Sequence, residues 1–262
     1  MAISVLQTAT SSVGGTGPTL SVSVTFSSAV TAGSTLAATW AVNGVNHAPS
    51  FNSVTDTLNN SYGPAVTNIE TGISDGYGDT IALWTGIYFA ANSPGGSNKV
   101  TMVYNLGQGY ASDGFLTIYE IAGLSLHPEV DQTGAQTGTS FPPSFSFTPN
   151  ASSTIALAAF ETFNGTAGFP DVTAGAGWTL DTASFSPWVF SNSSAPGGLI
   201  YGAAASEHRI LSNNSPVNVA ISQSVAGNNW VGCACTLEVA GASGGGYPHW
   251  LSTQNRDTMR HR

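Results

Sequence analysis

The sequence predicts an all-β protein made of two tandem antiparallel β-sandwiches. Three observations lead to this prediction: apolar residues alternate with polar ones, turn-forming residues separate the alternating stretches, and one series of short motifs occurs twice. The chain of 262 residues is long enough for two domains that each bury a core of their own.

The alternation has the period of a β-strand. Leu20, Val22 and Val24, for example, are separated by Ser21 and Ser23. Similar stretches lie at residues 35–42, 100–104 and 217–221. Such alternation is typical of strands with one buried and one exposed face. Glycine- and proline-rich turns follow at 14–15, 43–44, 94–96, 164–165 and 196–198.

An internal repeat divides the chain into two copies. The matching segments lie 113 to 121 residues apart and keep the same order: 35–40 with 154–160, 43–44 with 164–165, 51–55 with 169–173, 88–91 with 201–204, and 120–125 with 238–243. A repeat of this length corresponds to a whole domain. We expect two sandwiches of the immunoglobulin-like or jelly-roll-like kind, at 1–124 and 125–242, related by duplication and followed by a tail at 243–262.

Charged residues make up only 7% of the chain, and its formal net charge is -9. Because the acidic body repels phosphate backbones, the composition excludes nucleic acid as a partner of the folded part. No apolar run reaches the length of a membrane span, so no membrane partner is expected. The first residues also lack the charged start of a secretory signal; either a signal sequence has been removed, or the protein leaves the cell by another route such as lysis.

The two cysteines, Cys233 and Cys235, are expected on one face of a strand, where they cannot easily bond to each other. We interpret them as buried free thiols that act as small hydrophobic side chains. An unbridged pair fits synthesis in a reducing cytoplasm.

Four stretches resemble a loosely defined group of β-sandwich repeats in bacterial surface and secreted proteins and in phage virion proteins. They are Ala32-Gly33-Ser34-Thr35-Leu36, Ser53-Val54-Thr55-Asp56, Tyr88-Phe89-Ala90-Ala91 and Tyr119-Glu120-Ile121-Ala122-Gly123-Leu124. The resemblance covers most of the chain and consists of fold-forming residues. It implies no catalytic residues.

Candidate ligands are few. Asp75 and Asp79 lie at the two ends of a glycine-rich loop, and their carboxylates could hold calcium. The alternative is a solvated acidic loop, and no other cofactor is expected.

Tyr110 and Trp188 could offer a stacking platform for a glycan, or pack against their own domain. Glu120 and Glu238, paired by the repeat, are expected to accept hydrogen bonds from neighbouring turns. Because the repeat places them in different domains, they do not form a glycosidase pair.

The tail combines a Gly244-Gly245-Gly246 hinge with aromatic and basic side chains. We expect it to dock on another subunit through Tyr247, Trp250, Leu251, Arg256, Arg260 and Arg262, with a frayed end or a cloning remnant as the alternative.

These features together predict a non-enzymatic structural protein of a virion: a capsid decoration, head fibre or tail-associated subunit that binds other protein subunits. The alternative is a bacterial extracellular surface or filament protein, or an adhesin, for which a glycan is a candidate ligand.

Overall fold

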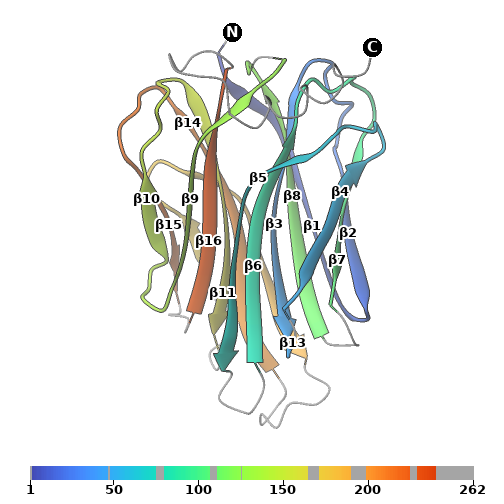
Figure 1. Cartoon of the computed structure of the whole chain (residues 1–262), viewed down its shortest axis with the longest axis vertical. Coiled ribbons are helices and arrows are strands. Elements are labelled where there is room, and N and C mark those ends of the chain that lie inside the picture. Colours follow the sequence, from blue (N-terminus) through green and yellow to red (C-terminus); the bar gives the residue numbers. More distant parts are fainter. Residues whose placement is uncertain are drawn as a thin grey trace, which may run out of the picture.

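The computed structural model describes residues 2–46, 48–74, 80–106, 111–124, 126–164, 171–189, 199–224 and 229–239. Sixteen β-strands, and no helix, are found in this described part of the chain (Figure 1). The predicted all-β fold with antiparallel sheets is therefore confirmed. Within the same residues, no helix is long and apolar enough to cross a membrane.

The first half of the chain forms one sandwich of a five-stranded and a three-stranded sheet. The larger sheet has the strand order β1-β8-β3-β6-β5 and the smaller one β2-β7-β4. The strands are β1 (Ser4–Thr16), β2 (Thr19–Thr25), β3 (Thr35–Val45), β4 (Ser50–Asp56), β5 (Gly63–Ser74), β6 (Thr80–Ala90), β7 (Lys99–Asn105) and β8 (Ala111–Ala122).

The second half forms a sandwich of the same composition. Its larger sheet has the order β13-β14-β11-β16-β9 and its smaller one β10-β15-β12. The strands are β9 (Glu129–Gly138), β10 (Ser144–Phe147), β11 (Thr154–Asn164), β12 (Val172–Ala174), β13 (Thr179–Val189), β14 (Leu199–Leu211), β15 (Val217–Gln223) and β16 (Asn229–Glu238).

The two sandwiches share one topology. When β1 to β8 are matched in sequence with β9 to β16, both sheets have the same strand order in the two halves. A gene duplication would produce this relationship, and the duplication itself stays a prediction.

Each sandwich buries a core between its own two sheets. In the first, alternate residues of β2, including Val22 and Val24, pack against Leu36, Ala38 and Trp40 of β3 and neighbouring side chains. In the second, alternate residues of β15 pack in the same way against β11. The period-two pattern in the sequence therefore identified the core-facing residues of these strands correctly.

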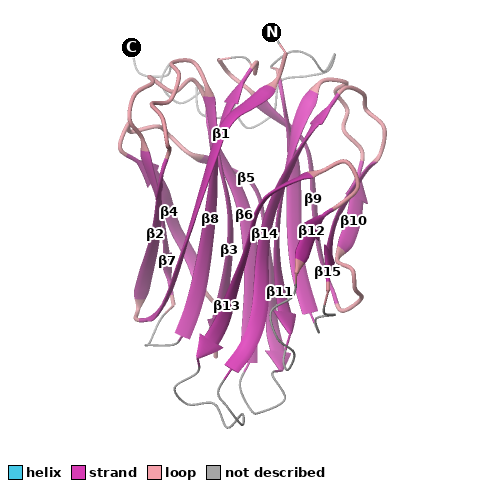
Figure 2. Cartoon of the chain, turned by 180° about the vertical axis from the view of Figure 1, so that it is seen from behind, coloured by secondary structure: helices cyan, strands magenta, loops and turns pink. Residues whose placement is uncertain are grey.

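The two five-stranded sheets also pack face to face, so the chain forms four layers with the smaller sheets outermost (Figures 1 and 2). Apolar side chains join them, such as Ala37, Ile87 and Tyr119 from the first sandwich and Leu157 and Cys235 from the second. In space, the edge strand β5 contacts β9, and the edge strand β1 contacts β13. In the shared topology, however, β1 is the equivalent of β9, and β5 is the equivalent of β13. This exchange is the arrangement that an approximate two-fold axis between the sheets produces.

Strand β3 shows the consequence of this packing. Its alternation predicted one buried and one exposed face, but every residue of β3 is buried. The prediction of a half-buried strand is therefore wrong here. Leu36, Ala38 and Trp40 face the smaller sheet, while the opposite face, with Ala37 and Thr39, meets the second sandwich.

Candidate functional site

Most residues selected from the sequence as ligands lie outside the described residues. This applies to the loop with Asp75 and Asp79 and to Tyr110, and for Trp188 only the backbone of β13 is described. It also applies to the docking residues of the tail, Tyr247, Trp250, Leu251, Arg256, Arg260 and Arg262. The calcium, glycan and tail hypotheses therefore stay predictions. Among the described residues, no group of three or more His, Cys, Asp or Glu side chains is placed to hold a metal ion.

Glu120, near the end of β8, is a buried carboxylate that accepts hydrogen bonds from three residues. Its Oε1 accepts hydrogen bonds from the Thr31 backbone N–H at 2.7 Å and from the Ser34 hydroxyl at 2.8 Å. Its Oε2 accepts one from the Gln7 amide at 2.6 Å. Burial alone would raise the pKa of Glu120, but the hydrogen bonds from Gln7, Thr31 and Ser34 outweigh it and lower the pKa below its ordinary value.

The predicted role of Glu120 as an acceptor for a neighbouring turn is therefore confirmed. The carboxylate ties β1 and the turn before β3 to the end of β8. Glu238 is also buried and lies at the matching end of β16. The two carboxylates belong to different sandwiches, as the repeat predicted.

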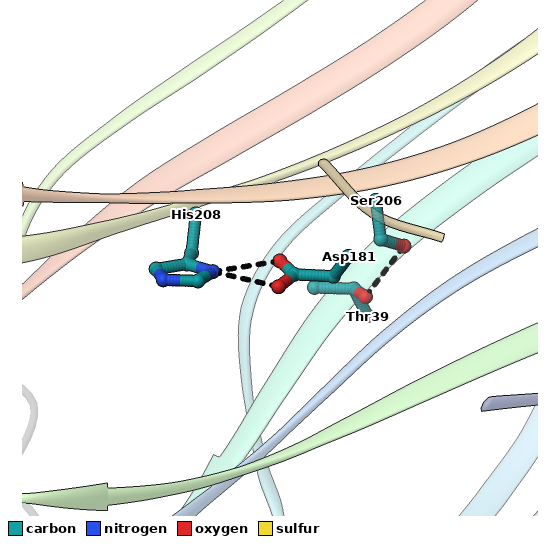
Figure 3. A network of polar contacts seen from close by, with 4 residues as sticks. All are labelled: Thr39, Asp181, Ser206 and His208. Atoms are coloured by element: carbon teal, nitrogen blue, oxygen red, sulfur yellow. Dashed lines mark hydrogen bonds and ion pairs between the residues drawn. The ribbon is translucent and has the colours of Figure 1, made fainter. Parts of the chain in front are cut away.

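A cluster of polar side chains lies in the interface between the two sandwiches (Figure 3). We call Thr39, Tyr119, Asp181, Ser206 and His208 the interface polar cluster. The Thr39 hydroxyl donates to the Ser206 hydroxyl at 2.8 Å. The Nδ1 atom of His208 lies 2.8 Å from both carboxylate oxygens of Asp181. The ring of Tyr119, from the first sandwich, meets the His208 ring edge to face.

Burial raises the pKa of the Tyr119 phenol well above its ordinary value, and the nearby Asp181 carboxylate raises it further. Asp181 itself is enclosed, with only 4% of its side chain exposed, while His208 keeps 16% exposed. The cluster therefore joins a neutral phenol, a hydroxyl pair and a His–Asp pair in a largely buried part of the interface.

The cluster contains serine, histidine and aspartate, but their order differs from that of a nucleophilic triad. In a triad the imidazole lies between the hydroxyl and the carboxylate, so that it can take the hydroxyl proton. Here Asp181 lies between His208 and Ser206, and the Ser206 hydroxyl meets Thr39 instead (Figure 3). This geometry does not activate Ser206.

Further side-chain hydrogen bonds cross between the sandwiches. Asn43 donates to Glu161 at 3.4 Å and Asn229 to Glu70 at 3.0 Å, while Asn68 donates to the Gly232 carbonyl at 3.0 Å. Glu161 is completely buried, and burial raises its pKa well above the ordinary value, an effect that the hydrogen bond from Asn43 offsets only in part. The interface is thus a mixed apolar and polar contact and not a purely hydrophobic one.

The thiols of Cys233 and Cys235 are unbridged and buried in the same interface. Burial raises the pKa of Cys233 to about 12. Since the thiolate is the reactive form of cysteine, both side chains act as packing groups in the native protein. The interpretation of the pair as buried free thiols is confirmed.

Sequence reasoning did not find the interface polar cluster. Asp181 and His208 are 27 positions apart and become neighbours only because β13 pairs with β14. One signal was available: Ser206 and His208 are two residues apart on an otherwise alanine-rich strand, so they share a face.

Comparisons with family models, with curated proteins and with solved structures each found no match.

Proposed function

We propose that the protein is a non-enzymatic structural subunit of a virion, such as a capsid decoration, head fibre or tail-associated protein. The observation that carries the proposal is the four-layer body, in which two sandwiches are joined through a buried interface. Long, fully buried strands such as β3 make this body resistant to bending and local opening, a property that suits a component of a particle.

Two further properties support the proposal. The free, buried thiols fit folding in a reducing cytoplasm, where virions are assembled before lysis. Only 7% of the residues are charged, which leaves few charged side chains to constrain contact with other subunits.

Mass spectrometry of purified particles and of cell-surface fractions from the source tests this role. We expect peptides of this chain in the particles at a stoichiometry that matches a repeated subunit. Detection in the cell-surface fraction alone would contradict the proposal and favour the surface protein or adhesin. Genes for capsid or tail proteins on either side of this gene are a second expected result.

The tail is proposed to reinforce the assembly. A variant that lacks residues 244–262 should keep both sandwiches folded, as measured by circular dichroism and thermal unfolding, but incorporate into particles less efficiently. Equal incorporation of the truncated and full chains would show that the tail does not dock.

The absence of catalysis is tested directly. Purified protein should leave polysaccharide and peptide substrates intact. Cleavage that disappears in Glu120→Gln or Glu238→Gln would contradict the non-enzymatic role.

A further inference from the structure

Strand β1 forms an open edge of the larger sheet in the first sandwich. Among the described residues it pairs only with β8, along the register from Ser4 opposite Ala122 to Thr16 opposite Ala111. Its other side therefore presents backbone N–H and C=O groups that no described strand uses. In Figure 2, β1 runs along most of the height of the first sandwich before the chain turns into β2. An edge of this kind is a template for a further strand.

The other long edges carry residues that discourage pairing. Strand β5 contains Pro64, and β13 contains Pro187. Strand β9 contains Glu129 and Asp131. Charges and prolines on an edge strand oppose the addition of another strand.

Strand β1 has neither safeguard. Its thirteen residues include no proline and no charged side chain. Strand β2 is also an uncharged edge, but it has only seven residues. The one irregularity of β1 is a bulge between Val5 and Gln7, which leaves a regular stretch from Gln7 onward.

The side chains of β1 are also uncovered on one face. Thr8, Thr10 and Ser12 are exposed on one face, and Leu6, at the bulge, is 48% exposed. The second sandwich thus covers this face of β1 only in part: β13 approaches it, but the side chains of Thr8, Thr10 and Ser12 stay exposed, whereas β3 is completely buried. Exposed threonines suit an added strand, since Thr–Thr pairs across neighbouring strands are favourable.

We propose that β1 pairs with β1 of a second copy of this chain, antiparallel and near its middle, and joins two larger sheets into one ten-stranded sheet. A second copy fits because an antiparallel pair of identical strands is self-complementary about a two-fold axis. An uncharged strand also lets two bodies of net charge -9 meet without like charges at the contact.

This inference deepens the proposed function, because it names the partner and the strand through which subunits join. The biological purpose of the β1 pairing rests on the proposed role as a structural subunit, but the pairing itself does not. A dimer can form through β1 whether or not the chain is found in particles, so the two proposals can fail separately.

Sedimentation velocity over a concentration series tests the pairing on the full chain. Wild type should show a reversible monomer–dimer equilibrium. Thr10→Lys should raise the dissociation constant of the dimer roughly tenfold or more, because two like charges then face each other near the two-fold axis. Thr133→Lys, at an exposed threonine on the guarded edge β9, is the matched control and should leave the dissociation constant unchanged.

A charge exchange makes the test specific to self-pairing. Thr10→Glu alone should dimerise as poorly as Thr10→Lys, while an equimolar mixture of the two should regain the dimer as a heterodimer. Thr10→Val should keep the dimer, and circular dichroism should show all variants folded. A wild type that stays monomeric, an equal effect of Thr133→Lys, or a mixture that stays monomeric would each overturn the proposal.

Discussion

The hydroxyl of Thr39 in β3 donates a hydrogen bond across 2.8 Å to the hydroxyl of Ser206 in β14, and both side chains are buried between the two sandwiches. The two residues are 167 positions apart, so their contact exists only when both halves of the chain have folded and met. It ties the stability of one sandwich to that of the other.

Thr39→Val and Ser206→Ala should each lower the free energy of unfolding by about 1–2 kcal/mol, because each leaves the remaining hydroxyl buried without its partner. The double variant should lose less than the sum of the two, with a coupling of about 1 kcal/mol. Urea unfolding of all four proteins measures both quantities.

The control is the Ser23–Thr101 pair, which has the same 2.8 Å distance but is only partly buried. Since water can replace either hydroxyl there, Ser23→Ala and Thr101→Val should change the stability little. Additive effects at Thr39 and Ser206 would show that their hydrogen bond does not couple the two sandwiches.

Glu120→Gln should destabilise the protein by about 1–3 kcal/mol at neutral pH, because an amide cannot accept all three hydrogen bonds and loses the charge that strengthens them. The lowered folded-state pKa sets the sign of the pH effect: the contribution of Glu120 is present above the pKa of the unfolded state and is lost as the pH falls through the folded-state pKa. The difference between wild type and variant should therefore shrink on acidification.

Thermal unfolding at several pH values measures this difference. Glu129→Gln makes the same chemical change on the edge strand β9 and should have little effect. Equal stabilities of the two variants would show that the hydrogen bonds to Glu120 contribute nothing.

Glu207, on β14, shows the opposite behaviour. Burial raises its pKa from 4.5 to about 8, although the Gly175 backbone N–H donates a hydrogen bond to it. Between pH 4.5 and about pH 8, Glu207 is therefore protonated in the folded state but ionised in the unfolded state. The contribution of Glu207 to the free energy of unfolding is complete below pH 4.5 and is lost as the pH rises through about 8.

Glu207→Gln keeps an acceptor for Gly175 but no longer titrates. The free energy of unfolding of the variant should therefore not change with pH through Glu207. Above pH 8 the variant should be more stable than wild type by roughly 1–2 kcal/mol. Denaturant unfolding across the pH range measures both curves. Curves that run parallel over the whole range would contradict a raised pKa at Glu207.

The sequence predicted each sandwich well and their contact poorly. The alternation of Val22 and Val24 with serines identifies a core-facing strand because the pattern is local to one segment. The second buried face of β3 carries Ala37, Thr39 and Ala41, whose small or polar side chains are equally typical of a solvent-facing strand. Only the arrangement of the two larger sheets reveals that this face is covered.

The site residues show the same difference between local patterns, which the sequence predicts, and contacts between distant segments, which it does not. The acceptor role of Glu120 follows from its place at a strand end beside a turn, and the structure shows it. The contact of Tyr119 with His208 and the pairing of His208 with Asp181 depend on strand register and on sheet packing. Sequence spacing carries no information about either.

The buried thiols offer a chemical probe of the interface. Cys233 and Cys235 are fully buried, and burial raises the pKa of Cys233 to about 12, so the native protein should resist alkylation by iodoacetamide at neutral pH. Both cysteines should react once the protein is unfolded in urea. The slow labelling of the native protein, followed by mass spectrometry, then reports how often the two larger sheets separate.

Leu157→Ala should increase this labelling rate about tenfold or more, because it removes a buried side chain from the cluster that contains both thiols, and such a change costs about 2–5 kcal/mol. Ile210→Ala is the matched control: Ile210 is 47% exposed on β14, and its truncation should leave the rate nearly unchanged. Rapid labelling of the wild type, or equal rates in the two variants, would show that the thiols are reached without opening the interface between the sandwiches.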